Sequence, residues 1–220
     1  MAHAAVMEPP APAERGAGVY NEKLGMWIFL GSEVMFFTAL IGSYIILRFG
    51  ASGEWARPGV VLNVPVTAFN TFLLICSSVS MVKAYASVVD GDQQKLKLWL
   101  LLTILAGASF VSVQVYEYIH LVHNGFLPSG IREGSELAEL MAAGTIPEAT
   151  ASIYGSTFYT MTGFHGFHVT CGVVSMIWVY LKALRGGYSA TDYRGVEVIG
   201  LYWHFVDLVW IILFTIVYLV

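Results

Sequence analysis

Charged residues are scarce in this sequence. Asp, Glu, Lys and Arg make up 12% of the 220 residues, whereas roughly 25% is typical of soluble domains. Hydrophobic residues make up 57%, and the mean hydropathy is +0.68. The net charge of −4 is mild and negative, so it gives no support for nucleic-acid binding. The composition indicates a protein whose solvent is lipid.

Cysteine is almost absent, with only Cys76 and Cys171. Both lie in apolar runs, which favours small core residues over a disulfide. There is no cysteine cluster of the kind that predicts a zinc or iron–sulfur site. The N-terminus also lacks the basic start and apolar stretch of a signal peptide. Its prolines predict a flexible tail over residues 1–23 that stays on the mature chain.

Five long apolar segments dominate the rest of the chain. A membrane span needs about 20 mainly apolar residues, and five segments qualify: Leu24–Leu47, Val60–Val82, Leu98–Ile119, Ile153–Leu181 and Val198–Val220. None alternates with period two as a membrane β-barrel would. The predicted fold class is therefore all-α, a polytopic five-helix membrane bundle over residues 24–220. We find no internal repeat, which disfavours an inverted-repeat transporter.

Basic residues are distributed unevenly between the two sides of this predicted bundle. The N-terminal side has eight: Arg15, Lys23, Lys83, Lys95, Lys97, Lys182, Arg185 and Arg194. The opposite side has three: Arg48, Arg57 and Arg132. Because basic loops stay in the cytoplasm, we expect the N-terminus inside and the C-terminus outside.

The connection over residues 121–152 is long and acidic. It contains Glu133, Glu136, Glu139 and Glu148. Within it, "SELAELMAAG" predicts a short helix that places Leu137, Leu140 and Met141 on one side and stops near Gly144. A helix resting on a neighbour or on headgroups, and a solvated helix with no partner, both remain open.

Several polar side chains fall inside the predicted spans. Glu33 and Asp207 each lie about nine residues into a predicted span. Because an α-helix rises about 1.5 Å per residue, both residues are expected near the middle of the bilayer. His165 and His168 share one helix face midway along the fourth span, and His204 shares another with Asp207. A charge at that depth costs on the order of 3 kcal/mol. Each pair must therefore face the protein interior or another subunit.

Three roles compete for these polar residues. A metal or haem site would use the three histidines and the carboxylates, but the sequence has no Glu-x-x-His pair. A proton or ion path is the second role. The third, hydrogen bonding between helices or capture of a lipid headgroup, is favoured by surrounding aromatic side chains such as Trp203. Lys182, at the end of its span, is placed to reach lipid phosphate or simply marks topology.

Four motifs make the chain resemble a known family. "WIFLGSEVMFF", "FNTFLLICSS", "YGSTFYTMTGFHGFHV" and "YWHFVDLVW" occur in the order and spacing of subunit III of haem-copper terminal oxidases. The resemblance covers about residues 24–220. It is strongest to the five-span bacterial form of cytochrome c oxidase subunit III.

The resemblance implies an accessory subunit without a catalytic residue, haem, copper or other metal of its own. Subunits I and II would hold the haem and copper, and this chain would pack on subunit I in the bacterial plasma membrane. It would bind phospholipid and sustain proton uptake and turnover stability. Glu33 matches the carbodiimide-reactive glutamate, with His168 beside it. The implied lipid-binding or helix-tying residues are His165, His168, Lys182, Trp203, His204 and Asp207.

The chain departs from the family pattern in two places. Lys182 stands where the family usually has Arg, which leaves a point charge in place of bidentate phosphate recognition. The acidic connection is longer than usual and suits a contact with an electron donor, such as cytochrome c or a donor complex in a supercomplex. Alternatives are subunit III of a quinol oxidase, the accessory subunit of nitric oxide reductase, a free-standing transporter or channel, and a haem-binding cytochrome.

Overall fold

The computed structural model describes residues 19–51, 55, 58–144 and 147–219, so most of the predicted tail lies outside the described residues. Five described helices are long and apolar enough to cross a membrane, which confirms the predicted five-span helical fold. They are α1 (Asn21–Gly50), α3 (Val64–Val89), α4 (Gln93–His123), α6 (Glu148–Leu184) and α7 (Arg194–Phe214). A π-helical turn, η1 (Thr215–Leu219), extends α7.

The start of α3 differs from the predicted span. The span was expected from Val60, but that residue belongs to a separate short helix, α2 (Pro58–Val61). α3 begins at Val64 because the Asn63 side chain caps it, accepting a hydrogen bond from the backbone N–H of Val66. Pro65, in the first turn, suits a helix start because no intrahelical partner is lost there.

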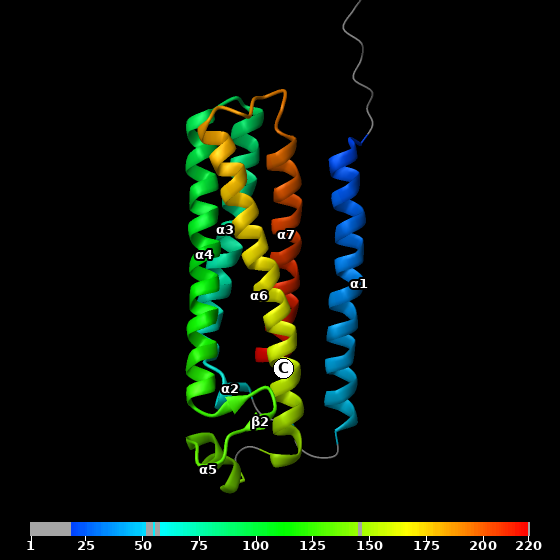
Figure 1. Ribbon diagram of the computed structural model, residues 1–220, viewed down its shortest axis with the longest axis vertical. Helices are drawn as coiled ribbons and strands as arrows, with labels where there is room; N and C mark the ends of the chain where they lie inside the picture. The colour runs from blue at the N-terminus through cyan, green and yellow to red at the C-terminus, as the bar shows by residue number, and fades with distance from the viewer. Residues whose placement is uncertain (1–18, 52–54, 56–57, 145–146, 220) are drawn as a thin grey trace, which may run out of the picture.

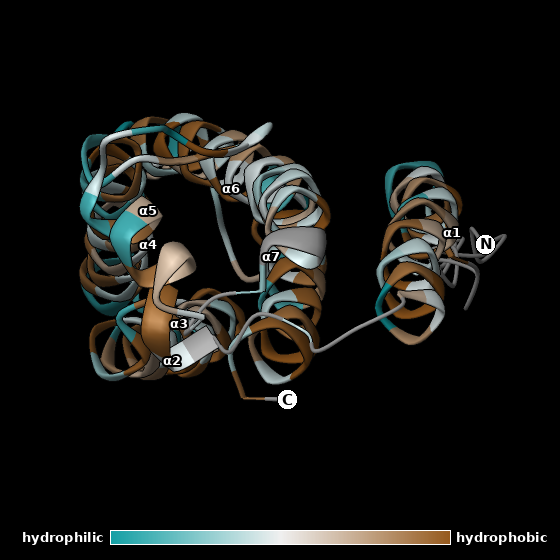
Figure 2. Cartoon of the chain, turned by 90° about the horizontal axis from the view of Figure 1, so that it is seen from below, coloured by the Kyte–Doolittle hydropathy of each residue, from teal (hydrophilic) through white to brown (hydrophobic). Residues whose placement is uncertain are grey.

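Four helices form the bundle, and α1 lies outside it. α3, α4, α6 and α7 surround a common core, while α1 packs against α7 and α6 from one side (Figures 1 and 2). Only 6% of the apolar stretch of α1 is buried, compared with 50% for α7. Phe37 and Tyr44 are the residues of α1 that are fully buried. α1 therefore depends on a few specific contacts to keep its place.

The connections gather at two opposite ends of the bundle (Figure 1). The end that we call the turn end contains the start of α1, the α3–α4 turn and the α6–α7 connection. The end that we call the hairpin end contains α2, β1 (Phe126–Leu127), β2 (Gly130–Ile131) and α5 (Glu136–Ala142). This alternation is the one expected for helices that cross a membrane in turn.

The short antiparallel hairpin β1–β2 packs over the first turns of α6. Phe126 is 1% exposed, and its carbonyl oxygen accepts a hydrogen bond from the Tyr159 hydroxyl at 2.8 Å. Glycine is required at position 155, because a Cβ there would lie 2.6 Å from the carbonyl oxygen of Leu127. The hairpin is thus packed onto the bundle.

The predicted helix in the acidic connection is present as α5. The Ser135 side chain caps it by accepting from the backbone N–H of Ala138. Leu137 is buried, and Leu140 and Met141 pack against the core cluster. α5 therefore rests on a neighbouring part of the chain, which favours the first of the two open interpretations.

The prediction that Cys76 and Cys171 are small core residues is wrong. Both are free and exposed. Their apolar sequence neighbours were poor evidence for burial, because a membrane protein turns apolar residues toward lipid as readily as toward its own interior.

Candidate functional site

A partly buried polar contact joins α1 to α6 near the middle of both helices. Glu33 Oε2 lies 3.0 Å from His168 Nε2, and the two side chains are 16% and 12% exposed. The Phe37 ring meets the imidazole edge-on, with ring centroids 5.1 Å apart. The pair is thus placed in apolar surroundings at mid-span.

The second ring nitrogen of His168 constrains where the proton between the two side chains lies. Nδ1 is 2.7 Å from the carbonyl oxygen of Phe164, and a carbonyl oxygen can only accept, so Nδ1 carries a hydrogen. Two arrangements satisfy Nε2. Either a protonated Glu33 donates to it, or a doubly protonated His168 donates to a Glu33 carboxylate. In both arrangements one proton lies between Glu33 and His168, and neither side chain carries a charge without an opposite partner.

α7 also contacts the backbone of this region. The Tyr202 hydroxyl donates to the carbonyl oxygen of His168 at 2.8 Å, and the Phe29 ring of α1 lies beside Tyr202 with centroids 6.1 Å apart. The contact between Glu33 and His168 therefore sits where α1, α6 and α7 meet.

His165 faces a different direction from His168. It is 0% exposed and stacks on Trp210 with ring centroids 4.7 Å apart. The Phe110 ring of α4 meets it edge-on at 6.0 Å. Neither ring nitrogen has a hydrogen-bond partner among the described residues. The two histidines were expected to act on one face, but His168 serves the α1 contact and His165 lies inside the four-helix core.

His204 and Asp207 lie at the contact between α3 and α7. His204 Nδ1 is 2.5 Å from the Ser78 hydroxyl of α3. Asp207 is 4% exposed, and neither of its carboxyl oxygens has a hydrogen bond of ordinary geometry with a described residue. His204 therefore joins α7 to α3, and Asp207 is enclosed beside it.

Trp203 stands at the centre of the bundle. It is 0% exposed, and its indole N–H donates to the Ser77 hydroxyl of α3 at 2.9 Å. Its ring fills space left by Gly107 of α4 and Gly172 of α6, where a Cβ would come within 2.6 and 2.9 Å of ring atoms. One side chain of α7 thus contacts the other three helices of the bundle.

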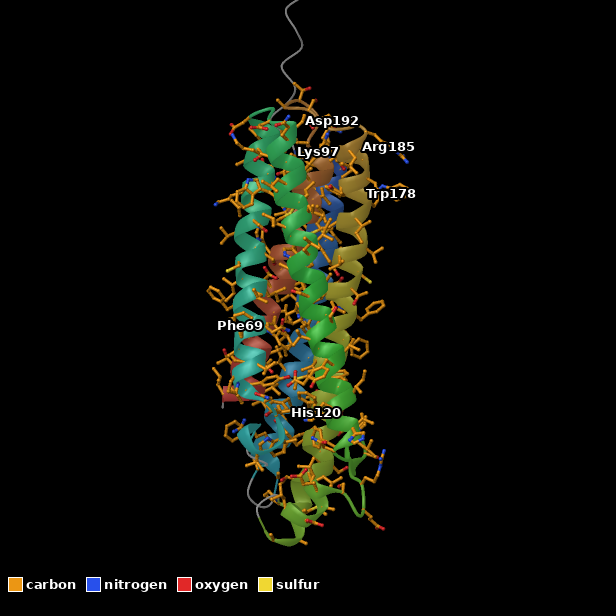
Figure 3. The ribbon with its side chains drawn as sticks, turned by 90° about the vertical axis from the view of Figure 1, so that its left-hand side faces the viewer. Phe69, Lys97, His120, Trp178, Arg185 and Asp192 are labelled. Atoms are coloured by element: carbon orange, nitrogen blue, oxygen red, sulfur yellow. The ribbon has the colours of Figure 1, made fainter. Side chains whose placement is uncertain are left out.

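Lys182 lies at the turn end of α6 beside a cavity. Its Nζ is 4.4 Å from the centroid of the Tyr188 ring, a cation–π contact. A cavity of about 200 Å³ is lined by Lys182, Leu181, Trp178 and Arg185. Trp178 and Arg185 project outward there (Figure 3). Arg185 was not among the predicted site residues, yet it shares the cavity with Lys182.

Sequence reasoning missed Glu117 as a buried polar residue. It is 9% exposed, and the Thr67 hydroxyl donates to its Oε1 at 3.1 Å. The Tyr218 hydroxyl lies 3.5 Å from its other oxygen. Glu117 falls inside the predicted third span, so its charge at that position was a signal that could have identified it.

A second missed cluster ties the start of α1 to the start of α7. Lys23 Nζ is 2.5 Å from Glu197 Oε1, and the Tyr20 hydroxyl donates to Glu197 Oε2 at 2.7 Å. Burial and the neighbouring Glu197 carboxylate raise the pKa of Tyr20 above its ordinary value. The sequence offered no clear signal for this cluster, because the partners are 174 and 177 positions apart.

Most of these polar residues contact side chains of another helix and do not gather into a ligand set. Within the described ranges, no group of three or more His, Cys, Asp or Glu side chains is placed to hold a metal ion. The contacts that these residues make run from one helix to another. This arrangement can hold helices together and keep a proton between Glu33 and His168.

Comparison with known proteins gives one consistent family. The family model described as cytochrome c oxidase subunit III matches residues 16–124 and 135–220. A probable cytochrome c oxidase subunit 3 of Mycobacterium leprae is 36% identical over 90% of this chain and 87% of its own. Cytochrome c oxidase subunit 3 of Bacillus sp. (strain PS3) is 32% identical over 96% of this chain and 92% of its own. The gap in the family match, 125–134, contains the β1–β2 hairpin.

Proposed function

Since this chain belongs to the cytochrome c oxidase subunit III family, we propose that it is the accessory, non-catalytic subunit of a proton-pumping cytochrome c oxidase. In this proposal it packs on subunit I in the bacterial plasma membrane. Subunits I and II carry the haem and copper. The chain binds phospholipid and sustains proton uptake and stability during turnover.

The contact between Glu33 and His168 is the observation that carries this proposal. Both ring nitrogens of His168 are engaged, and the ring faces α1, so its role is to hold a proton and join helices. His204 and Trp203 likewise contact hydroxyl groups on α3. These contacts favour a structural role for the polar side chains, which join helices, while Glu33 and His168 share one proton.

The cavity at the turn end supports the lipid-binding part of the proposal. Lys182 and Arg185 supply positive charge beside the exposed indole of Trp178. Basic side chains at a helix end attract anionic headgroups, and tryptophan prefers the membrane interface. We place a phospholipid headgroup there, with its acyl chain along the apolar face of α6.

The test is to purify the tagged chain in mild detergent and examine what accompanies it. We expect a reduced-minus-oxidised spectrum with haem bands, and oxygen uptake driven by reduced cytochrome c. Oxygen uptake driven only by quinol would replace cytochrome c oxidase with a quinol oxidase. A lone chain, recovered without haem where other complexes survive, would overturn the subunit function and favour a transporter.

The contribution to turnover needs a second comparison. Oxidase lacking this chain should keep its haem spectrum and initial electron transfer, but take up protons more slowly and lose activity sooner during turnover. The intact complex, assayed in the same lipid mixture, is the control. Equal proton uptake and equal lifetime with and without the chain would contradict this part of the proposal.

A further inference from the structure

A shallow groove runs between α4 and α6 at the depth of the His165 and His168 segment. It has a volume of about 190 Å³. Its lining comes from both helices and includes Gln114 and Tyr118 of α4 and Thr162, Gly163, Gly166 and Phe167 of α6. Phe167 is 64% exposed at its rim. In the view along the bundle, α4 lies on the side away from α1 (Figure 2).

Gln114 places an unused hydrogen-bond acceptor in this groove. The residue is 7% exposed, and its Nε2 donates to the carbonyl oxygen of Thr162 at 2.9 Å. Because that carbonyl oxygen can only accept, the orientation of the amide is fixed. Oε1 is then left without a hydrogen-bond partner among the described residues.

Glycine in α6 allows the Gln114 amide to reach this position. A Cβ at Gly166 would lie 3.1 Å from Gln114 Oε1, so a larger residue would displace the amide. At Gly163 a Cβ would meet only the Tyr118 hydroxyl, at 3.8 Å. The space at Gly166 is thus taken by Gln114, whereas Gly163, one turn away, lets another helix approach α6 closely.

The hydroxyl groups around the groove have already committed their hydrogens. The Thr162 hydroxyl donates to the carbonyl oxygen of Phe158, so the Tyr118 hydroxyl, 2.5 Å away, is the donor between those two. The Thr170 hydroxyl donates to the carbonyl oxygen of Gly166. In the part of the chain that the structure describes, no group donates to Gln114 Oε1.

These observations restrict the occupant. Acyl chains carry no donor, and lipid headgroup donors lie at the membrane surface rather than at mid-span. A buried acceptor without a partner is unfavourable, because its hydration is lost and nothing replaces it. A transmembrane helix that presents a hydroxyl, amide or indole N–H at this depth would remove that cost. It would also fill the open space beside Gly163.

We propose that the α4–α6 groove receives a transmembrane helix of a partner oxidase subunit, which donates a side-chain hydrogen bond to Gln114 Oε1. This inference rests on the proposed function, because it takes its partner from the oxidase complex. It adds the face of the chain on which that partner lies and the chemistry of the contact.

Photo-crosslinking in the intact complex tests the groove. A benzophenone amino acid replaces Phe167 in one variant. In the control it replaces Phe69, which is 65% exposed on α3 (Figure 3). We expect the probe at 167 to form a covalent adduct with another oxidase subunit several-fold more often than the probe at 69. Equal yields, adducts with lipid alone, or adducts with a second copy of this chain would overturn the proposal.

A second pair of variants tests the role of Gly163. Gly163→Leu fills the groove without meeting backbone, whereas Gly31→Leu adds the same side chain on α1, where a Cβ meets nothing within 4 Å. We expect Gly163→Leu to retain several-fold less partner subunit after detergent washing and Gly31→Leu to retain the usual amount. Full retention in both would overturn the proposal. If the unmodified chain purifies without any haem-bearing subunit, the proposed function fails first, and this inference falls with it.

Discussion

The indole of Trp203 occupies space that α4 and α6 leave open by placing glycine at 107 and 172. A methyl group at Gly172 would lie 2.9 Å from two indole atoms, and one at Gly107 would lie 2.6 Å from the indole Cη2. Trp203 also bonds Ser77, so it cannot move without losing that bond. We therefore expect Gly107→Ala to lower the free energy of unfolding by about 1–3 kcal/mol. Thermal unfolding in detergent would measure it.

Gly31→Ala provides the matched control for this prediction. It makes the same change in a helix where a Cβ meets nothing within 4 Å. Alanine is favoured over glycine inside a helix by roughly 0.5–1 kcal/mol, so this variant should be as stable as the unmodified chain or slightly more so. A loss of stability at Gly31 as large as that at Gly107 would contradict the packing explanation.

Glu33 is the residue whose chemistry should be directly detectable. Hydrophobic carbodiimides react with carboxyl groups in apolar surroundings, and Glu33 is bonded to His168 in such surroundings. We expect Glu33→Ala to abolish carbodiimide labelling of this chain while electron transfer in the complex is unchanged. Mass spectrometry of the labelled chain would show it. Asp207→Asn should keep the labelling. If labelling survives in Glu33→Ala, the reactive carboxyl group lies elsewhere.

The sequence predicted which residues are polar at mid-span, but not where each one points. His165 and His168 are separated by about 60° around the helix axis, and this angle is enough to direct one into the core and the other toward α1. Gln114 and Glu117 were overlooked, although a polar residue inside an apolar span is itself a signal. Their importance comes from partners on other helices, which one sequence does not reveal.

At the scale of the element, α1 is held by contacts at two positions along its length. Glu33 joins it to α6 at mid-span, and Lys23 and Tyr20 join its start to Glu197 of α7. The sequence predicted that α1 exists but not that it lies outside the bundle. Its residues are apolar on all sides, so composition does not distinguish a face toward lipid from a face toward protein.

The contact of Tyr20 with Glu197 should depend on pH. Burial and the Glu197 carboxylate raise the pKa of Tyr20 above its ordinary value of 10.0. A detached Tyr20 loses its proton near pH 10, whereas a docked one keeps it. The stabilisation is therefore fully present below that pH and declines as the pH rises further. Hydrogen exchange in the first turn of α1 would measure it.

Tyr20→Phe is the control for this pH dependence, because it lacks the hydroxyl but keeps the ring. The unmodified chain should exchange more slowly than Tyr20→Phe. This difference in exchange rate should be constant below about pH 10 and shrink above it. Comparing the two at each pH removes the intrinsic pH dependence of exchange. An advantage that stays constant above pH 10 would mean that the hydroxyl does not contribute through this bond.

For the whole molecule, the sequence predicted five spans and the grouping of the connections at two ends. It did not predict how the hairpin end is packed. The β1–β2 hairpin depends on Gly155, which lets Leu127 approach α6, and on the bond from Tyr159 to Phe126. Such contacts join segments about 30 residues apart, and the turn residues alone do not specify them.

The side of the membrane that each end faces is the remaining prediction at this scale. Eight basic residues against three predict that the turn end faces the cytoplasm. Cys76 and Cys171 are exposed, so both are first replaced by alanine. A single cysteine is then introduced at Asp90, at the turn end, or at Glu133, at the hairpin end. In intact cells, a membrane-impermeant maleimide should label Glu133→Cys, and Asp90→Cys only after permeabilisation. The reverse pattern would invert the chain and place the acidic hairpin end in the cytoplasm, away from any external electron donor.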